Sequence, residues 1–318
     1  MQYRQLGERG PVVSTVGLGT WAIGGRDWGK TDDEVSRRAI NKALDCGVTL
    51  LDTADVYGFG HSEELIAEVL DARGRPEIIV ATKAGNDFYN TTSADDKGYG
   101  AITQNYDRDY LITAAEKSLM RLKVETIDIL QLHSPDLQWL ERDDPWDALA
   151  TLKGQGKIRH AGWSVQSFKE TEQAHLLDRH HDLLDCLQVR YNLLEREAEK
   201  VLFPKAMQYG IGVIVRIPIL FGLLAGKFTR ESRFGDDDHR RFNLSPDKLA
   251  SYLDRTERLR PFFGQFPDQS MGQVSLRFCI SHPACQTVIP GAKTADQVDE
   301  NCAAADFGPL SPEAVSPL

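Results

Sequence analysis

The sequence has no run of apolar residues long enough to form a signal peptide or a membrane span. Its first ten residues mix charged and apolar side chains instead. Positive charge is also in the minority, with 37 Lys and Arg against 47 Asp and Glu, a net charge of −10 over 318 residues. Nucleic-acid-binding domains are usually basic, so this balance argues against nucleic acid as a partner. We expect a cytoplasmic protein that binds neither nucleic acid nor membrane.

Cysteine is scarce and scattered, and no two cysteines form a Cys-x-x-Cys pair. The five residues are Cys46, Cys186, Cys279, Cys285 and Cys302. We expect them to be reduced, mostly buried thiols and expect no metal site. Linkers rich in Pro or Ser are missing too, whereas 41% of the residues are hydrophobic, enough for a large core. The chain is therefore predicted to form a single domain over residues 1–318.

What the chain does contain is a repeated alternation of short apolar segments and longer amphipathic ones. The strand-like segments are 16–19, 48–51, 78–82, 127–132, 158–163, 186–189, 212–216 and 287–290. The helix-like segments that follow them are 31–46, 62–70, 107–122, 145–153, 168–177, 197–209, 246–262 and 295–304. Eight such units predict a parallel sheet covered by helices.

An α/β fold with eight units closes most simply into a single (β/α)8 TIM barrel. The competing fold, a doubly wound open sheet, needs fewer strands and usually carries a Gly-x-Gly-x-x-Gly turn, which neither Gly17-Leu18-Gly19 nor Gly58-Phe59-Gly60 completes. Residues 3–6 and 12–13 flank a turn and predict an N-terminal β-hairpin below the barrel. The long loops are expected at the C-terminal face.

Polar residues follow three neighbouring strands at that face: Asp52, Lys83 and His133. A buried Lys is costly unless a carboxylate accompanies it, and Asp52 on the adjacent strand would be that partner. The loop after Asp52 could bring Tyr57 over Lys83, whose charge would then move the pKa of the phenol toward neutrality. These groups suit proton delivery to a carbonyl oxygen, with neutral His133 orienting that oxygen, but they supply no electrons.

The motifs around these residues point to a known family. They are Asp52-Thr53-Ala54-Asp55-Val56-Tyr57-Gly58, Gly60-His61-Ser62-Glu63, Thr82-Lys83, Leu130-Gln131-Leu132-His133-Ser134-Pro135-Asp136 and Val288-Ile289-Pro290-Gly291-Ala292-Lys293. In this order and at these strand ends, they resemble the aldo-keto reductase superfamily, most of all its bacterial oxidoreductase branch, over nearly the whole chain. The resemblance implies a catalytic tetrad of Asp52, Tyr57, Lys83 and His133, with Tyr57 as the general acid. It also implies hydride transfer from NADPH, with NADH possible, and no metal.

The same resemblance predicts where the cofactor binds. The predicted cofactor residues are Gly19, Thr20, Trp21, Asp52, Ser164, Gln188, Arg216, Pro218, Leu220, Gly222, Lys227, Gly291, Ala292, Lys293, Gln297, Glu300 and Asn301. Ser164 and Gln188 would hold the carboxamide, residues 218–227 would wrap the pyrophosphate, and Lys293 would meet a 2′-phosphate.

The chain departs from the family at three of these places. Val165 stands where the family usually has Asn, which removes one hydrogen bond to the carboxamide. Arg216 stands where many members place an aromatic ring, and its flat guanidinium could also stack on the nicotinamide. Gln297 replaces the family's Arg near the 2′-phosphate, which leaves NADH open.

Trp21, Tyr57, Phe88 and His133 are the predicted substrate residues. The long loop 84–106 is expected to add aromatic walls from Tyr89, Tyr99 and Tyr106. The acidic and basic run at 236–241 is predicted to be a solvated loop. The leading hypothesis is NADPH-dependent reduction of aldehydes or ketones to alcohols. The alternatives are an NAD(P)-dependent sugar dehydrogenase working oxidatively and a nicotinamide-binding regulatory subunit. The expected partner is a small carbonyl or sugar substrate, and the oligomeric state is left open.

Overall fold

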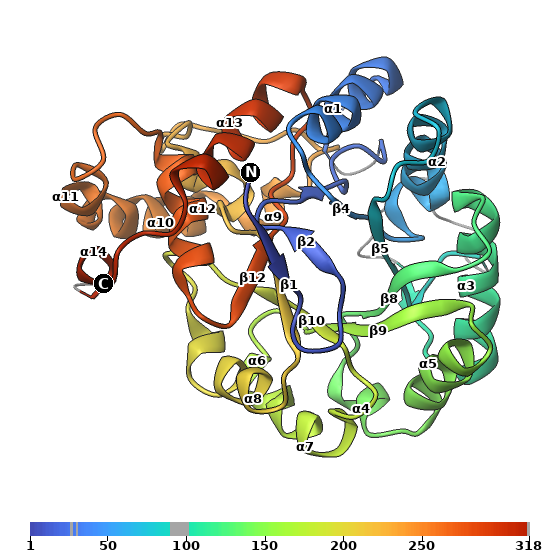
Figure 1. Cartoon of the computed structure of the whole chain (residues 1–318). Helices are drawn as coiled ribbons and strands as arrows, with labels where there is room; N and C mark the ends of the chain where they lie inside the picture. Colours follow the sequence, from blue (N-terminus) through green and yellow to red (C-terminus); the bar gives the residue numbers. More distant parts are fainter. Residues whose placement is uncertain (26–27, 30, 90–101, 317–318) are drawn as a thin grey trace.

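A curled sheet of eight parallel strands forms the centre of the computed structural model, which describes residues 1–25, 28–29, 31–89 and 102–316 (Figure 1). The strands are β3 (Leu18–Gly19), β4 (Leu50–Asp52), β5 (Ile79–Ala84), β8 (Ile127–His133), β9 (Ile158–Ser164), β10 (Cys186–Arg190), β11 (Gly212–Arg216) and β12 (Cys285–Val288). They pair in chain order, and parallel bridges from Val16 to Val288 and from Gly19 to Gly291 join the last strand to the first. The predicted (β/α)8 barrel is confirmed.

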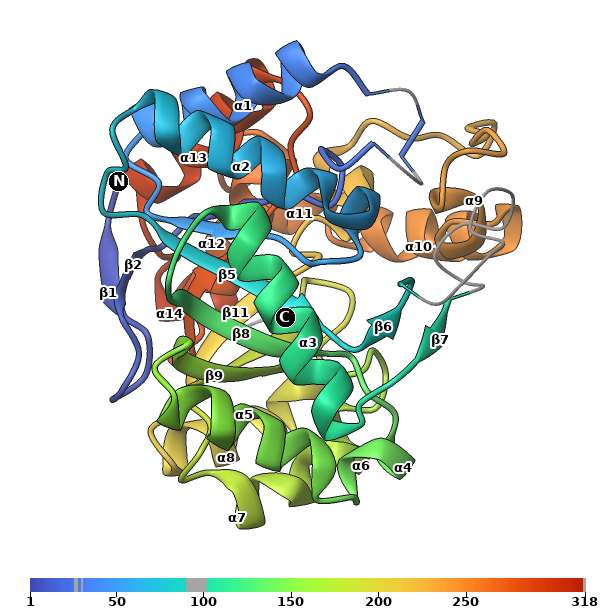
Figure 2. The same ribbon diagram turned by 90° about the vertical axis from the view of Figure 1, so that its right-hand side faces the viewer.

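Helices surround this sheet on its outer side (Figure 2). The α-helices are α1 (Asp33–Asp45), α2 (His61–Ala72), α3 (Arg108–Leu122), α4 (Leu137–Leu140), α5 (Asp144–Gly154), α6 (Glu170–Gln173), α7 (Leu177–His180), α8 (Leu202–Gln208), α9 (Arg240–Asn243), α10 (Pro246–Arg258), α11 (Arg260–Phe263), α12 (Met271–Ser281), α13 (Ala295–Phe307) and α14 (Pro312–Val315). Short 3-10 segments are η1 (Tyr57–Gly60), η3 (Ala174–Leu176), η4 (Glu197–Glu199) and η5 (Leu220–Ala225). No helix in the described ranges is long and apolar enough to cross a membrane.

The N-terminal hairpin closes the end of the barrel opposite the long loops. Strands β1 (Tyr3–Gln5) and β2 (Val12–Ser14) pair in antiparallel fashion. Leu6 and Val13 beside them are fully buried against inward-facing residues of the barrel strands, among them Ile129 and Ile214. The open end of the barrel is therefore the one at which the carboxyl ends of the strands lie. In Figure 2, β6 and β7 lie at this end, on the side opposite the hairpin.

Four segments differ from the sequence-based expectation. The predicted helix over 168–177 is broken into α6, η3 and α7, and the one over 197–209 into η4 and α8. Helix α12 was not predicted, although Ser270 and Gln273 form a capping box at its start that is readable from the sequence. The loop 84–106 contains a strand pair, β6 (Asn86–Asp87) with β7 (Thr103–Gln104), while its Tyr99 lies outside the described residues.

Candidate active site

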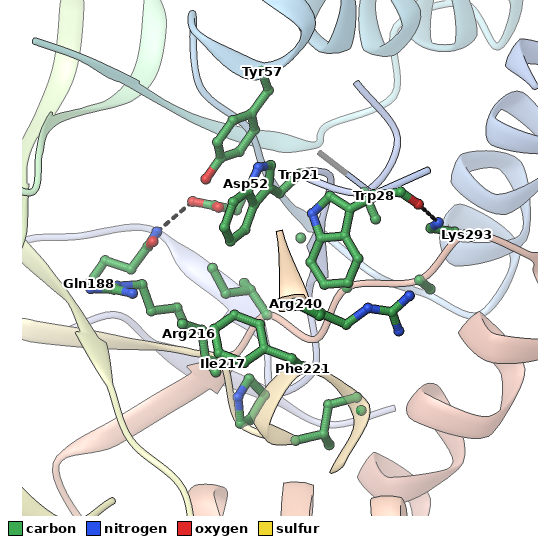
Figure 3. A pocket seen from close by; sticks show the side chains of 18 of the residues that line it. Trp21, Trp28, Asp52, Tyr57, Gln188, Arg216, Ile217, Phe221, Arg240 and Lys293 are labelled. Atoms are coloured by element: carbon green, nitrogen blue, oxygen red, sulfur yellow. Dashed lines mark hydrogen bonds between the residues drawn. The ribbon is translucent and has the colours of Figure 1, made fainter. Parts of the chain in front are cut away.

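A cavity of about 770 Å³ lies at the carboxyl ends of the barrel strands. Its walls include Gly19, Asp52, His133, Ser164 and Arg216, which end strands β3, β4, β8, β9 and β11. Because parallel strands end at one rim, residues far apart in the sequence meet here. Figure 3 shows Gln188, Asp52 and Tyr57 toward one side of this cavity and Arg240 and Lys293 toward the other.

A buried ion pair stands behind the cavity wall. The Lys83 ammonium donates hydrogen bonds to Asp52 Oδ1 and to the Thr53 carbonyl oxygen, both at 2.7 Å. The two charged side chains are only 1% and 4% exposed. Burial lowers the pKa of Lys83, whereas the Asp52 carboxylate raises it. The second Asp52 oxygen accepts from Gln188 Nε2 at 2.5 Å, so three strands hold this carboxylate.

Tyr57 reaches the pair from the loop after β4. Its hydroxyl lies 3.5 Å from Lys83 Nζ, and its ring lies edge-on to His133 with centroids 5.7 Å apart. The tight η1 segment that presents Tyr57 depends on Gly58, which has φ +61° and whose missing Cβ would collide with the Gly24 carbonyl oxygen. The local sequence therefore explains why the phenol points toward the ion pair.

The pKa of Tyr57 corrects the sequence-based expectation. Burial raises the pKa of Tyr57 well above its ordinary value, the Asp52 carboxylate raises it further, and Arg216 lowers it. Although Lys83 Nζ lies 3.5 Å from the phenol oxygen, the net effect of the surroundings is a raised pKa and not one near neutrality. Tyr57 is therefore a protonated hydrogen-bond donor in this site.

His133, at the end of β8, is a neutral imidazole. Burial lowers its pKa well below the ordinary value, and the positive charges of Lys83 and Arg216 lower it further. A neutral ring has one N–H group to donate and one nitrogen that accepts. The site thus combines a phenol donor and an imidazole donor beside an ammonium group, an arrangement that can protonate and orient an oxygen atom.

Most of the predicted cofactor residues line the cavity. They are Gly19, Trp21, Asp52, Ser164, Gln188, Arg216, Pro218, Gly222, Lys227, Gly291, Ala292, Lys293, Gln297, Glu300 and Asn301. Trp21, Tyr57 and His133 of the predicted substrate residues line it as well. Lys83 lies behind the wall, as expected of a group that acts through Tyr57.

Three residues predicted to contact the cofactor or the substrate lie outside the cavity lining. Thr20 is fully buried and its hydroxyl donates to the Asp52 carbonyl oxygen at 2.9 Å. Leu220 is fully buried in the apolar core. The Phe88 ring packs on Tyr89 and stacks on Phe59, with centroids 4.0 Å and 5.3 Å apart. Their side chains lie behind the cavity lining, and contact of these residues with cofactor or substrate stays a prediction.

The aromatic walls predicted from loop 84–106 are also corrected. Tyr106 is fully buried, and its hydroxyl donates to the His133 carbonyl oxygen at 2.6 Å. Tyr89 is turned to Arg121, whose guanidinium donates to the Tyr89 hydroxyl at 2.9 Å. The polar sequence of the loop suggests that its side chains are exposed. The hydroxyls of Tyr106 and Tyr89 instead bond to His133 and Arg121, which the fold brings to them from other parts of the chain.

The far end of the cavity contains residues that the sequence did not single out. Asp238 and His239 are buried, and Arg240 lines the cavity, although the run 236–241 was predicted to be solvated. The His239 ring packs against Trp21 and Trp28, with centroids 4.2 Å and 4.3 Å apart. An isolated bridge joins Trp28 to Asp238. No local pattern marks this contact, because it joins segments about two hundred residues apart.

Arg216 and the distant cations fit a nicotinamide dinucleotide. The guanidinium donates to the Val165 carbonyl oxygen and to Ser167 Oγ, both at 2.9 Å, while its buried Nε has no hydrogen-bond partner among the described residues. Burial lowers the pKa of Arg216 to about 10. A flat, partly satisfied cation on the wall suits a flat polar ring.

The opposite end suits an anionic group. Lys293 donates to the Trp28 carbonyl oxygen (Figure 3). Arg240 pairs with Asp238. Arg240 and Lys293 both line this end of the cavity, where burial lowers the pKa of Lys293 and the nearby Arg240 lowers it further. The backbone N–H of Lys293 donates to Gln297 Oε1 at 2.7 Å, so Gln297 supports the turn before α13.

The comparisons with known proteins agree with this geometry. The aldo/keto reductase family model matches residues 15–318. The chain is 32% identical to aldo-keto reductase YhdN of Bacillus subtilis (strain 168) over 302 residues, covering 94% of this chain and 87% of that protein. It superposes on the glycerol dehydrogenase AKR11B4 from Gluconobacter oxydans with a TM-score of 0.81 and 31% identity, over 99% and 93% of the two chains. The holo form of aldo-keto reductase AKR11C1 from Bacillus halodurans gives 0.78 and 27%, over 99% and 94%.

Proposed function

The chain belongs to the aldo/keto reductase family, and from this premise we propose that it reduces aldehydes or ketones to alcohols with NADPH, using Tyr57 as the proton donor. The observation that carries the proposal is the position of the protonated Tyr57 hydroxyl, 3.5 Å from the buried Lys83 ammonium on the cavity wall. A phenol held beside an ammonium can release its proton and leave a stabilised phenolate. The oxidoreductase class itself follows from the family.

Each of the four tetrad residues has a distinct role in the proposed reduction. A reduced nicotinamide, when bound, would supply the hydride that the carbonyl carbon accepts. Tyr57 donates its proton to the carbonyl oxygen, so a C–O–H group forms as the phenolic O–H bond breaks. Lys83 stabilises the resulting phenolate, and Asp52 holds Lys83 in place at 2.7 Å. His133 donates a hydrogen bond to the same oxygen and orients the carbonyl.

The preference for NADPH rests on Lys293 at the far end of the cavity. We expect Lys293→Met to raise the Kd for NADPH at least about tenfold and to leave the Kd for NADH nearly unchanged, because a charge-assisted bond to a 2′-phosphate is worth about 1.5–3 kcal/mol. Fluorescence titration with each cofactor measures both constants. Lys200→Met, which removes an exposed lysine paired with Glu197, is the matched control. Equal losses for the two cofactors would contradict a 2′-phosphate contact.

The pH dependence of reduction follows from the two donors. The raised pKa of Tyr57 keeps the phenol protonated as pH rises, and the lowered pKa of His133 keeps the imidazole neutral as pH falls. We therefore expect kcat/KM for carbonyl reduction to be nearly flat between about pH 6 and about pH 9. Initial rates across buffers of constant ionic strength test this. A single ionisation near pH 7 would show that one of the two pKa directions is wrong.

The defining experiment follows the absorbance of the reduced cofactor. NADPH and NADH are each offered with a panel of small aldehydes and ketones, and NADP⁺ and NAD⁺ with polyols and aldoses. Turnover of the carbonyl panel with NADPH supports the proposal. Turnover confined to the oxidative assays would favour the sugar dehydrogenase, which the similarity to a glycerol dehydrogenase makes worth testing. Tight cofactor binding without any turnover would favour the regulatory subunit.

A further inference from the structure

One hydrogen bond to the candidate catalytic histidine comes from a residue outside the tetrad. The side-chain amide nitrogen of Asn86, Nδ2, lies 3.0 Å from Nδ1 of His133. An amide nitrogen can only donate, so Nδ1 of the ring must accept. A neutral imidazole carries a single N–H group, which then has to be on Nε2.

We propose that Asn86 is a positioning residue that holds His133 in its Nε2–H tautomer, so that the ring presents a donor to the substrate oxygen. The opposite tautomer would present a bare nitrogen lone pair to a carbonyl oxygen and repel it. The identity of the accepting oxygen rests on the proposed carbonyl reduction. The tautomer itself does not, because the Asn86 contact exists in the protein alone.

Both partners are anchored from outside the contact. The Tyr110 hydroxyl donates to the Asn86 carbonyl oxygen at 2.9 Å, and the Tyr106 hydroxyl donates to that of His133 at 2.6 Å. Gly85, with φ +127°, lets the chain turn between Lys83 and Asn86 where a Cβ would collide with the Tyr106 ring. Two tyrosines and a glycine thus fix the backbones that carry the amide and the imidazole.

The β6–β7 pair gives Asn86 a further constraint. Asn86 lies opposite Gln104 in the register, and Gln104 Nε2 donates to the Ser134 carbonyl oxygen at 3.0 Å. This second contact ties the strand pair to the residue that follows His133. The β6–β7 strand pair therefore contacts the end of β8 at two points, and Asn86 provides the contact with the imidazole.

The tautomer is directly observable. In protein with ¹⁵N-labelled histidine, a long-range ¹H–¹⁵N correlation spectrum distinguishes a protonated ring nitrogen from a bare one, and the spectrum of His133→Gln assigns the signals. We expect wild-type His133 to show a bare Nδ1 and a protonated Nε2. A protonated Nδ1 in the wild type would overturn the proposal.

Two variants test the role of Asn86. In Asn86→Asp the carboxylate can only accept, so the single proton of the neutral ring should move to Nδ1 and leave Nε2 bare. In Asn86→Leu neither tautomer is selected, and a mixture is expected. Gln104→Glu places the same new charge on the paired strand without touching the ring and should leave Nδ1 bare. An Nδ1 that stays bare in Asn86→Asp would overturn the proposal.

Kinetics separate a positioning role from a merely structural one. Loss of the Nε2 donor should lower kcat/KM for carbonyl reduction by about 100-fold in Asn86→Asp, the usual effect of removing one oxyanion donor. The Kd for the cofactor should stay within about twofold of wild type, because affinity for a ligand that Asn86 does not hold is preserved. Loss of cofactor affinity and turnover together, with an unchanged tautomer, would indicate structural damage and contradict the proposal. Since the spectra need no substrate, they stand even if carbonyl reduction itself fails.

Discussion

Tyr57→Phe should lower kcat for carbonyl reduction by at least about 100-fold, within the range of about 10²–10⁴ that general acids contribute. The variant keeps the ring, which packs beside Trp21 with centroids 6.0 Å apart and planes at 15°, and removes only the hydroxyl 3.5 Å from Lys83. Cofactor affinity should change little, because the proton is needed in the transition state and not for binding.

The measurement compares single-turnover rates and cofactor titrations for wild type and Tyr57→Phe. Tyr209→Phe is the matched control, since it removes a tyrosine hydroxyl that donates to Asp178 at 2.7 Å on the outside of the barrel. It should retain wild-type kcat. Full activity in Tyr57→Phe would show that the proton comes from another group, and the proposed mechanism would have to be abandoned.

Lys83→Met should destabilise the protein by about 3–5 kcal/mol, the usual cost of leaving a buried charge without its partner. Asp52 is 4% exposed, and its neighbour Lys83 is 1% exposed. Asp52→Asn should cost less, because burial already lowers the pKa of Lys83 and a lysine left without its partner can lose its proton.

The double variant Asp52→Asn/Lys83→Met removes both charges and should recover most of the lost stability while remaining inactive. Urea unfolding of the four proteins in this cycle gives the coupling free energy. The cycle therefore distinguishes stability from turnover. The free energy of unfolding depends on whether both charges are present or both absent, whereas turnover requires the Lys83 ammonium beside Tyr57. A double variant as unstable as Lys83→Met would contradict the assignment of this cost to the unpaired charge.

The tetrad is locatable from the sequence because parallel strands end at one rim. Asp52, Lys83 and His133 each follow a strand-like segment, and adjacency of those strands places them together. The Gly58 turn that presents Tyr57 is equally local, since a positive φ marks where glycine is required. Motif order extends the prediction to the cofactor cavity, where most of the predicted residues do lie on the wall.

The ionisation of the site is not readable in the same way. The proximity of Tyr57 to Lys83 suggests a lowered phenol pKa. Whether the pKa is lowered or raised depends also on how deeply the phenol is buried and on the Asp52 carboxylate nearby, which pairs with Lys83. Burial and the electrostatic effect of neighbouring charges each arise from residues on several strands. The same holds for His133, whose tautomer depends on Asn86 from the β6–β7 pair inside a segment that resembles plain loop in the sequence.

The sequence by itself determined the barrel, the order of its strands, the three polar residues at strand ends and the turn that carries Tyr57, because strand and helix periodicity and glycine turns are local properties of the chain. Only the tertiary structure decided which side chains close the cavity. Arg240, His239 and Trp28 meet there through contacts between segments far apart in the chain, whereas the hydroxyls of Thr20 and Tyr106 donate to backbone carbonyl oxygens behind the cavity wall. These side-chain positions follow from packing and from the hydrogen bonding of buried polar groups. The partners come from distant parts of the chain, so no periodic pattern within one segment predicts them.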